Sequence, residues 1–111
     1  MRIQIKGRNV TVDDELKARV EKRFQKVARQ VSEVAPLEFE LTEERNPSIS
    51  EPWIAEATLY VKGKTLRAKA AAANPVTAIN RVSDELSRQV KRHRDQRRKR
   101  REAHRATPKL A

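Results

Sequence analysis

The chain has 111 residues, of which 26 are Lys or Arg and 15 are Asp or Glu, so its formal charge is +11. This length suits one domain, and an aromatic content of 4% predicts a thin, mainly aliphatic core. No run approaches the ~18 apolar residues of a membrane-spanning helix, the first residues lack the apolar stretch of a secretory signal, and the lack of cysteine excludes disulfides and thiolate chemistry. We therefore expect a small cytoplasmic domain that attracts polyanions.

The first part of the chain predicts a strand, a helix and a second strand. Residues 2–6 alternate polar and apolar side chains, as a half-buried strand does. Thr11 is the expected N-cap of a helix over residues 13–32. The apolar stripe of this helix consists of Leu16, Val20, Phe24, Val27 and Val31. Residues 37–42 alternate again, which predicts the second strand with Leu37, Phe39 and Leu41 buried.

The rest of the chain predicts two more strands and a long helix. Residues 45–52 form the longest loop, and strands over 53–61 and 65–72 are joined by a turn at Gly63. Asn74 and Pro75 are the expected N-cap and first residue of the second helix. Its apolar stripe consists of Val76, Ile79, Val82, Leu86 and Val90. Because no aliphatic residue extends this stripe beyond Val90, the helix is expected to project from there, basic on all sides.

The order of strand, helix, three strands and helix predicts an α+β fold with two layers, in which a four-stranded sheet carries both helices on one face. The first helix is expected to connect two parallel strands, and the other strands to form a meander. We divide the chain into a domain over residues 1–93 and a basic extension, or the start of a linker, over residues 94–111. Residues 1–90 carry a net charge of +3, whereas residues 91–105 carry +7.

The sequence predicts no catalytic, metal or cofactor site. His93 and His104 lie in the basic segment without a carboxylate at ligand or triad spacing, so we expect both on the surface. The carboxylates have structural explanations at helix starts, on strands and in loops, and the two glycines stand too far apart for a phosphate cradle. We therefore expect a binding protein rather than an enzyme, with no small-molecule substrate.

Basic residues follow one side of each helix. In the first helix they form a ridge about 15 Å long at ~1.5 Å per residue, made of Arg19, Lys22, Arg23, Lys26 and Arg29. In the second helix they are Arg81, Arg88, Arg92 and Lys99, with Lys91 nearby. A solvated outer face is the alternative interpretation, but the alternating signs of an ion-paired surface are missing. We expect the two ridges to meet in one groove that binds a polyanion.

Folded RNA fits this pattern better than other polyanions. The acidic residues 13–15 at the start of the first helix repel phosphate, so that end does not suit base reading in a DNA groove. Bases along a helix flank suit recognition of RNA by its shape. Few exposed aromatic residues are expected, which disfavours a stacking platform for single strands, and neither helix has an exposed apolar face for a membrane.

Four stretches in chain order resemble the ribosome hibernation promoting factors and the ribosome-associated inhibitor A. Residues 5–9 resemble the end of the family's first strand, 20–27 its first helix, 54–59 its third strand, and 77–80 with 86–92 its second helix. The resemblance covers about residues 2–95 and implies a β-α-β-β-β-α fold similar to double-stranded RNA-binding domains. Two departures stand out, because Asn74-Pro75-Val76 replaces the family's Asp-Met-Tyr and Glu85 replaces a usual lysine.

The resemblance also implies a function. The family binds the small ribosomal subunit and its 16S-type RNA, alone or within 70S or 100S ribosomes, in the channel used by messenger and transfer RNA. Occupying that channel blocks translation and protects idle ribosomes under stress or in stationary phase. The family's RNA-contacting bases correspond here to Lys22, Arg23, Lys26, Arg29, Arg88, Lys91 and Arg92. The charge pattern adds Arg19 and Arg81, with Arg94, Arg97, Arg98 and Lys99 as auxiliary phosphate contacts.

Two other functions remain as alternatives. The basic extension could drive general compaction of DNA or RNA. The open face of the sheet could instead bind a protein partner, through Gln4, Lys6, Glu38, Glu40, Thr58, Tyr60, Arg67 and Lys69.

Overall fold

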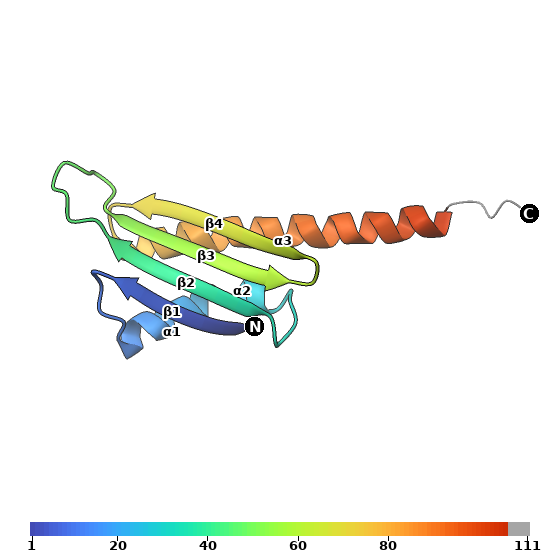
Figure 1. The fold of residues 1–111 in the computed structure, drawn as a ribbon, viewed down its shortest axis with the longest axis horizontal. Helices are drawn as coiled ribbons and strands as arrows, with labels where there is room; N and C mark the ends of the chain where they lie inside the picture. Colours follow the sequence, from blue (N-terminus) through green and yellow to red (C-terminus); the bar gives the residue numbers. More distant parts are fainter. Residues whose placement is uncertain (107–111) are drawn as a thin grey trace, which may run out of the picture.

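The computed structural model describes the backbone of residues 1–106 and the side chains of residues 1–103, which form one sheet and three helices (Figure 1). In chain order the elements are β1 (Arg2–Arg8), α1 (Asp14–Arg23), α2 (Gln25–Ala28), β2 (Pro36–Glu43), β3 (Trp53–Val61), β4 (Lys64–Ala72) and α3 (Pro75–Ala106). The sheet has the order β1-β2-β3-β4, with β1 parallel to β2 and the other neighbours antiparallel. The predicted α+β fold and its parallel crossover are confirmed. Residues 107–111 of the predicted extension lie outside the described residues.

The helices cover one face of the sheet because every strand turns alternate apolar side chains towards it. The buried apolar strand residues are Leu37, Phe39, Leu41, Ala55, Ala57, Leu59, Leu66, Ala68 and Ala72. Alanines predominate on β3 and β4, where α3 packs, and they leave room for a close approach of the helix. On the other half of the sheet, Phe24 meets Phe39 edge to face, with ring centroids 5.8 Å apart. This aromatic contact fixes α1 and α2 to β2.

The first helix differs from the prediction. Asp13, not Thr11, is the N-cap, because its Oδ1 accepts the N–H of Leu16 at 2.8 Å. The helix predicted over residues 13–32 is interrupted at Phe24, whose φ of −90° and ψ of 3° separate α1 from α2. It ends at Ala28, because tight turns follow and redirect the chain towards β2.

The residue types in the stretch 5–9 are explained by the tight backbone geometry at the end of β1 and in the turn after it. A Cβ at Gly7 would lie 2.3 Å from the carbonyl oxygen of Val10, so the backbone passes too closely for any other residue. Asn9 has a φ of +60°, a conformation that asparagine tolerates well, and its Nδ2 donates to the carbonyl oxygen of Glu43 at 3.3 Å. Gly7 therefore allows the turn that follows β1, and Asn9 ties this turn to the end of β2.

The long helix α3 begins at the predicted residue and extends beyond the end of the sheet. Asn74 caps it, with Oδ1 accepting the N–H of Thr77 at 2.8 Å. The helix buries side chains as far as Val90 and continues to Ala106, so about 16 residues, or roughly 24 Å, project beyond the core. Figure 1 shows this projection, which extends the molecule to 69 Å along its longest axis. The predicted projection is therefore confirmed.

The other face of the sheet is open and carries mixed charges. In one row across the strands, Lys6, Glu40, Glu56 and Lys69 are in register, so two glutamates face each other between two lysines. Thr58 in the neighbouring row is only 7% exposed, which differs from the expectation that it is available to a partner. The interaction role of this face stays a prediction.

We expect Phe24→Ala to destabilise the fold by about 3–5 kcal/mol, because it removes a fully buried ring and its contact with Phe39. Urea unfolding followed by circular dichroism would measure the loss. Val34→Ala is the control, since Val34 is 62% exposed and should change the free energy of unfolding by less than about 0.5 kcal/mol. Equal effects of the two substitutions would contradict the assigned core.

Candidate nucleic-acid interface

The first basic row lies on α1, α2 and the turn after them. Its five members are exposed, as predicted, namely Arg19, Lys22, Arg23, Lys26 and Arg29. The interruption at Phe24 separates Lys26 from the bases of α1, so the row is not one straight ridge. We call these five residues the α1–α2 row.

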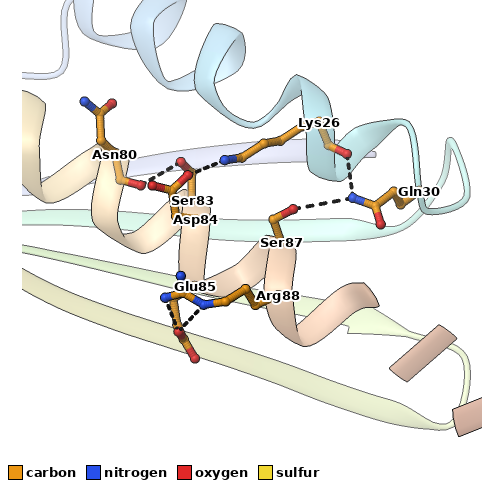
Figure 2. A network of polar contacts seen from close by, with 8 residues as sticks. All are labelled: Lys26, Gln30, Asn80, Ser83, Asp84, Glu85, Ser87 and Arg88. Carbon is orange, nitrogen blue, oxygen red and sulfur yellow. Dashed lines mark hydrogen bonds and ion pairs between the residues drawn. The ribbon is translucent and has the colours of Figure 1, made fainter. Parts of the chain in front are cut away.

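One flank of this row faces α3 through a polar junction (Figure 2). The ammonium of Lys26 forms an ion pair with Asp84 of α3. One turn along, the Gln30 Nε2 donates to the Lys26 carbonyl oxygen at 3.0 Å and to the Ser87 Oγ at 3.5 Å. Residues 58 positions apart are joined here, so no local sequence signal could have revealed the junction.

Two of the predicted bases of α3, Arg81 and Arg88, turn away from the α1–α2 row, whereas a common groove with the other bases of α3 stays a prediction. Arg81 reaches to β4, where its Nη1 donates to the Ala71 carbonyl oxygen at 2.7 Å, and it lies 3.6 Å from Glu51. Arg88 also lies on the side of α3 away from Lys26, as Figure 2 shows. The reason is helical geometry, because Ser87 faces α2, residues 81, 85 and 88 lie on the flank towards β4, and Asp84 stands between the two sides.

A shallow groove of about 550 Å³ runs along this second flank. It lies between α3 and β4 and is lined by residues 67–70 of the strand and by Arg81, Asp84, Glu85, Arg88 and Gln89 of the helix. Gln89 closes it at one end by donating to the Arg67 carbonyl oxygen at 2.6 Å. The flank therefore combines cations with two carboxylates, and sequence reasoning missed the role of Gln89.

The two carboxylates of α3 partly neutralise the basic surface. Arg88 places Nη2 at 2.7 Å and Nε at 3.2 Å from one oxygen of Glu85. This hydrogen bonding by Arg88 lowers the pKa of Glu85 below its usual value, and Gln89 and the charge of Arg92 act in the same direction. Glu85 is thus an anion at neutral pH. Exposed ion pairs of this kind contribute only about 0–1 kcal/mol, so a phosphate can displace the carboxylate at little cost.

Most of the predicted contacts keep their cations available. Within the part of the chain that the structure describes, ion pairs involve Lys26, Arg81, Arg88 and Arg98 among the predicted residues. The others are exposed and form none there, namely Arg19, Lys22, Arg23, Arg29, Lys91, Arg92, Arg94, Arg97 and Lys99. Lys91, Arg92 and Lys99 continue past Arg88 along the outer side of α3. Whether these residues contact RNA stays a prediction.

His93 is half-buried rather than on the surface as expected. Burial lowers the pKa of His93 below its ordinary value, and the charges of Arg97, Lys64 and Arg100 lower it further, so the ring is neutral at pH 7. Among residues 1–103, no three His, Asp or Glu side chains are placed to hold a metal ion. No helix in the described part of the chain has the length and apolar character needed to span a membrane.

The sequence is similar to those of proteins from one known family. Residues 3–98 match the model of the family described as Sigma 54 modulation protein / S30EA ribosomal protein. The ribosome hibernation promoting factor of Salmonella typhimurium is 30% identical over 95 residues, which are 86% of this chain and 95% of that relative. The ribosome hibernation promotion factor of Picosynechococcus is 27% identical over 96 residues, and the chain spans 50% of its length.

Solved structures agree with the sequence relatives. The N-terminal domain of Thermus thermophilus Protein Y superposes with a TM-score of 0.71 at 26% identity, covering 84% of this chain and 99% of that domain. A ribosomal subunit interface protein from Coxiella burnetii gives a TM-score of 0.69 at 16% identity, covering 86% and 99%, and it shows the fold alone. The resemblance indicated by the four short stretches is confirmed.

We expect the Lys26–Asp84 pair to stabilise the fold by only about 0.2–1 kcal/mol, because the two side chains are 46% and 55% exposed. A double-mutant cycle with Lys26→Ala and Asp84→Ala in urea unfolding measures this coupling. A coupling above about 2 kcal/mol would show that the pair holds α2 against α3 and is not free to exchange with a phosphate.

Proposed function

The chain belongs to the family of Sigma 54 modulation and S30EA ribosomal proteins, and we propose on this premise that it is a ribosome hibernation factor that binds small-subunit RNA. In this proposal the domain occupies the channel used by messenger and transfer RNA, which blocks translation and stabilises idle ribosomes. It acts by occupancy without catalysis, in the cytoplasm, on small subunits or on 70S or 100S ribosomes. Relatives named as ribosome hibernation factors support the assignment.

The observation that carries the proposal is the α1–α2 row. Four of its cations, Arg19, Lys22, Arg23 and Arg29, are exposed and without an ion pair in the described residues. Three of the four are arginines, whose planar guanidinium groups can each donate two hydrogen bonds to one phosphate. Because the backbone of α1, α2 and the following turn is anchored in the core by Val20, Phe24 and Val27, these side chains start from defined positions opposite the phosphates of folded RNA.

The local arrangement also favours binding by the flank of the helix. The N-terminal turn of α1 carries Asp13, Asp14 and Glu15, and Asp13 is already engaged as the N-cap. These charges repel phosphate from the end of the helix. An RNA backbone that lies along α1 and α2 avoids them and can replace Asp84 as the partner of Lys26.

We expect the triple variant Arg19→Glu, Arg23→Glu and Arg29→Glu to lose co-sedimentation with small subunits in sucrose gradients while it stays folded. The matched control is Lys17→Glu, Arg45→Glu and Lys64→Glu, which makes the same charge change at exposed positions outside the predicted interface. The log–log salt dependence of RNA binding should become shallower by about two to three in the triple variant. Normal co-sedimentation of that variant would overturn the proposed interface.

A second function rests on the charge of the projecting helix, because residues 91–105 carry a net charge of +7. If this charge drives general nucleic-acid compaction, deletion of residues 94–111 should abolish ribosome association. We expect the deletion to retain association with weaker affinity, because the core ends at Val90 and the α1–α2 row is intact. The same gradients separate 30S, 70S and 100S particles, and complete loss of association would favour the compaction function.

A further inference from the structure

A groove opens where α3 leaves the sheet. Figure 1 shows the helix passing the β3–β4 hairpin and the loop between α2 and β2, which lie at the same end of the sheet. These three segments enclose a groove of about 660 Å³. It is distinct from the α1–α2 row, whose exposed arginines do not line it. We call it the hairpin groove.

The floor of the hairpin groove is apolar and aliphatic. It is lined by Val31, Val34, Val61, Leu66 and Val90, which come from all three segments. Val34 is 62% exposed, the most exposed large apolar side chain in the described part of the chain. An apolar floor that remains open to water favours a partner with apolar side chains of its own.

One wall of the hairpin groove is cationic. Arg94, Arg97 and Arg101 line it from α3. At 100° per residue, these positions continue the stripe of Leu86 and Val90, so the helix face that is apolar over the sheet becomes basic beyond it. Arg92 and Lys99 lie on the opposite side of the helix and do not line the groove. The helix therefore presents two separate basic faces.

The lining of this groove selects one class of occupant. Aliphatic side chains do not stack bases as aromatic ones do. Of the two aromatic rings in the lining, Tyr60 lies near Glu38, with its Oη 3.4 Å from the carboxylate, and His93 is half-buried. A projecting helix of a second copy carries the same arginines and would be repelled. Apolar side chains and carboxylates together satisfy both the floor and the wall.

We propose that the hairpin groove binds an acidic amphipathic segment of a partner protein. Two or three aliphatic side chains of this segment contact the valines of the floor, and its carboxylates pair with Arg94, Arg97 and Arg101. His93 also lines the groove, with its buried Nε2 lacking a hydrogen-bond partner among the described residues. The roughly 24 Å of projecting helix matches a helical segment of about 16 residues. The proposal does not depend on RNA binding by the α1–α2 row, although it uses Arg94 and Arg97, which are also predicted auxiliary phosphate contacts.

The probe is a fluorescein-labelled synthetic peptide of about 16 residues, with leucines at helical spacings of three and four and glutamates between them. Two control peptides replace the leucines by serine or the glutamates by glutamine. Binding to the full chain is measured by fluorescence anisotropy, and the contacted residues by amide chemical shifts. We expect the first peptide to bind, both control peptides to bind at least about tenfold more weakly, and the shifts to map to the hairpin groove.

Two protein variants test the site itself. We expect Arg97→Glu with Arg101→Glu to weaken binding by at least about tenfold, whereas Arg92→Glu with Lys99→Glu, the same charge change on the other side of α3, should alter it by less than about threefold. Val34→Asp should also abolish binding, and it should not affect folding because the side chain is exposed.

Three results would overturn the proposal. If the Arg92 and Lys99 variant lost as much peptide affinity as the Arg97 and Arg101 variant, attraction by net charge alone would explain binding. If the serine peptide bound as tightly as the leucine peptide, the apolar floor would have no role. Binding of oligouridylate, but not of the leucine–glutamate peptide, with a dependence on Arg97 and Arg101 would make the groove an RNA site. Ribosome co-sedimentation of Val34→Asp is measured in parallel, so failure of this proposal is separable from failure of the ribosome assignment.

Discussion

The burial of one aliphatic stripe of α3 against β3 and β4 determines the arrangement of the charged surfaces to which α3 contributes. Ile79, Val82 and Leu86 are fully buried, so the rotation of the helix about its axis is fixed. That rotation turns Asp84 and Ser87 towards α2 and turns Arg81, Glu85 and Arg88 towards β4. Beyond the sheet, the positions that continue this stripe are occupied by the arginines of the hairpin groove. A change in this packing would therefore alter three surfaces at once.

The surface charges act within limits that the fold sets. The domain up to residue 90 is nearly balanced, with a net charge of +3, and two of its carboxylates stand among the bases of α3. Specific binding must then come from where the cations stand rather than from their number. The projecting helix has the larger net charge, which increases attraction and association rate over a long range but selects poorly between polyanions. The domain therefore contributes specifically placed cations, and the projecting helix contributes most of the net charge.

The sequence predicted well what depends on local patterns. Alternation identified the buried face of β2, and Asn74 with Pro75 marked the start of α3. The chain order and the apolar stripes were enough to predict the sheet with its helices on one face. Asp13 replaced Thr11 as the cap because both are good caps by type, and only the backbone decides between them.

The interface could be predicted only in part. Exposure of the basic residues follows from amphipathic spacing, and the structure bears it out. The different placement of Arg81 and Arg88 could not be predicted, because spacing along a helix does not give its rotation relative to a neighbouring element. Contacts such as Lys26 with Asp84, or Gln89 with the backbone of Arg67, depend on that rotation and on tertiary packing. The interruption at Phe24 could not be predicted either, because the apolar stripe of the predicted first helix continues through Phe24 to Val31 without a break.

Some of the predicted RNA contacts and the wall of the hairpin groove lie on the same helix, α3, so binding at one site can affect the other. An acidic segment in the hairpin groove would neutralise Arg97 and Arg101, while Arg92 and Lys99 on the opposite face remained available. An α-helix with its side chains is about 10–12 Å across, and the Debye length at physiological ionic strength is about 8 Å, so the added negative charge would be felt only weakly on the far side. The α1–α2 row stands on a segment that Val20, Phe24 and Val27 anchor in the core. Occupancy of the groove would therefore lower polyanion attraction by the helix more than specific binding by the domain, and this difference would grow smaller as salt is raised.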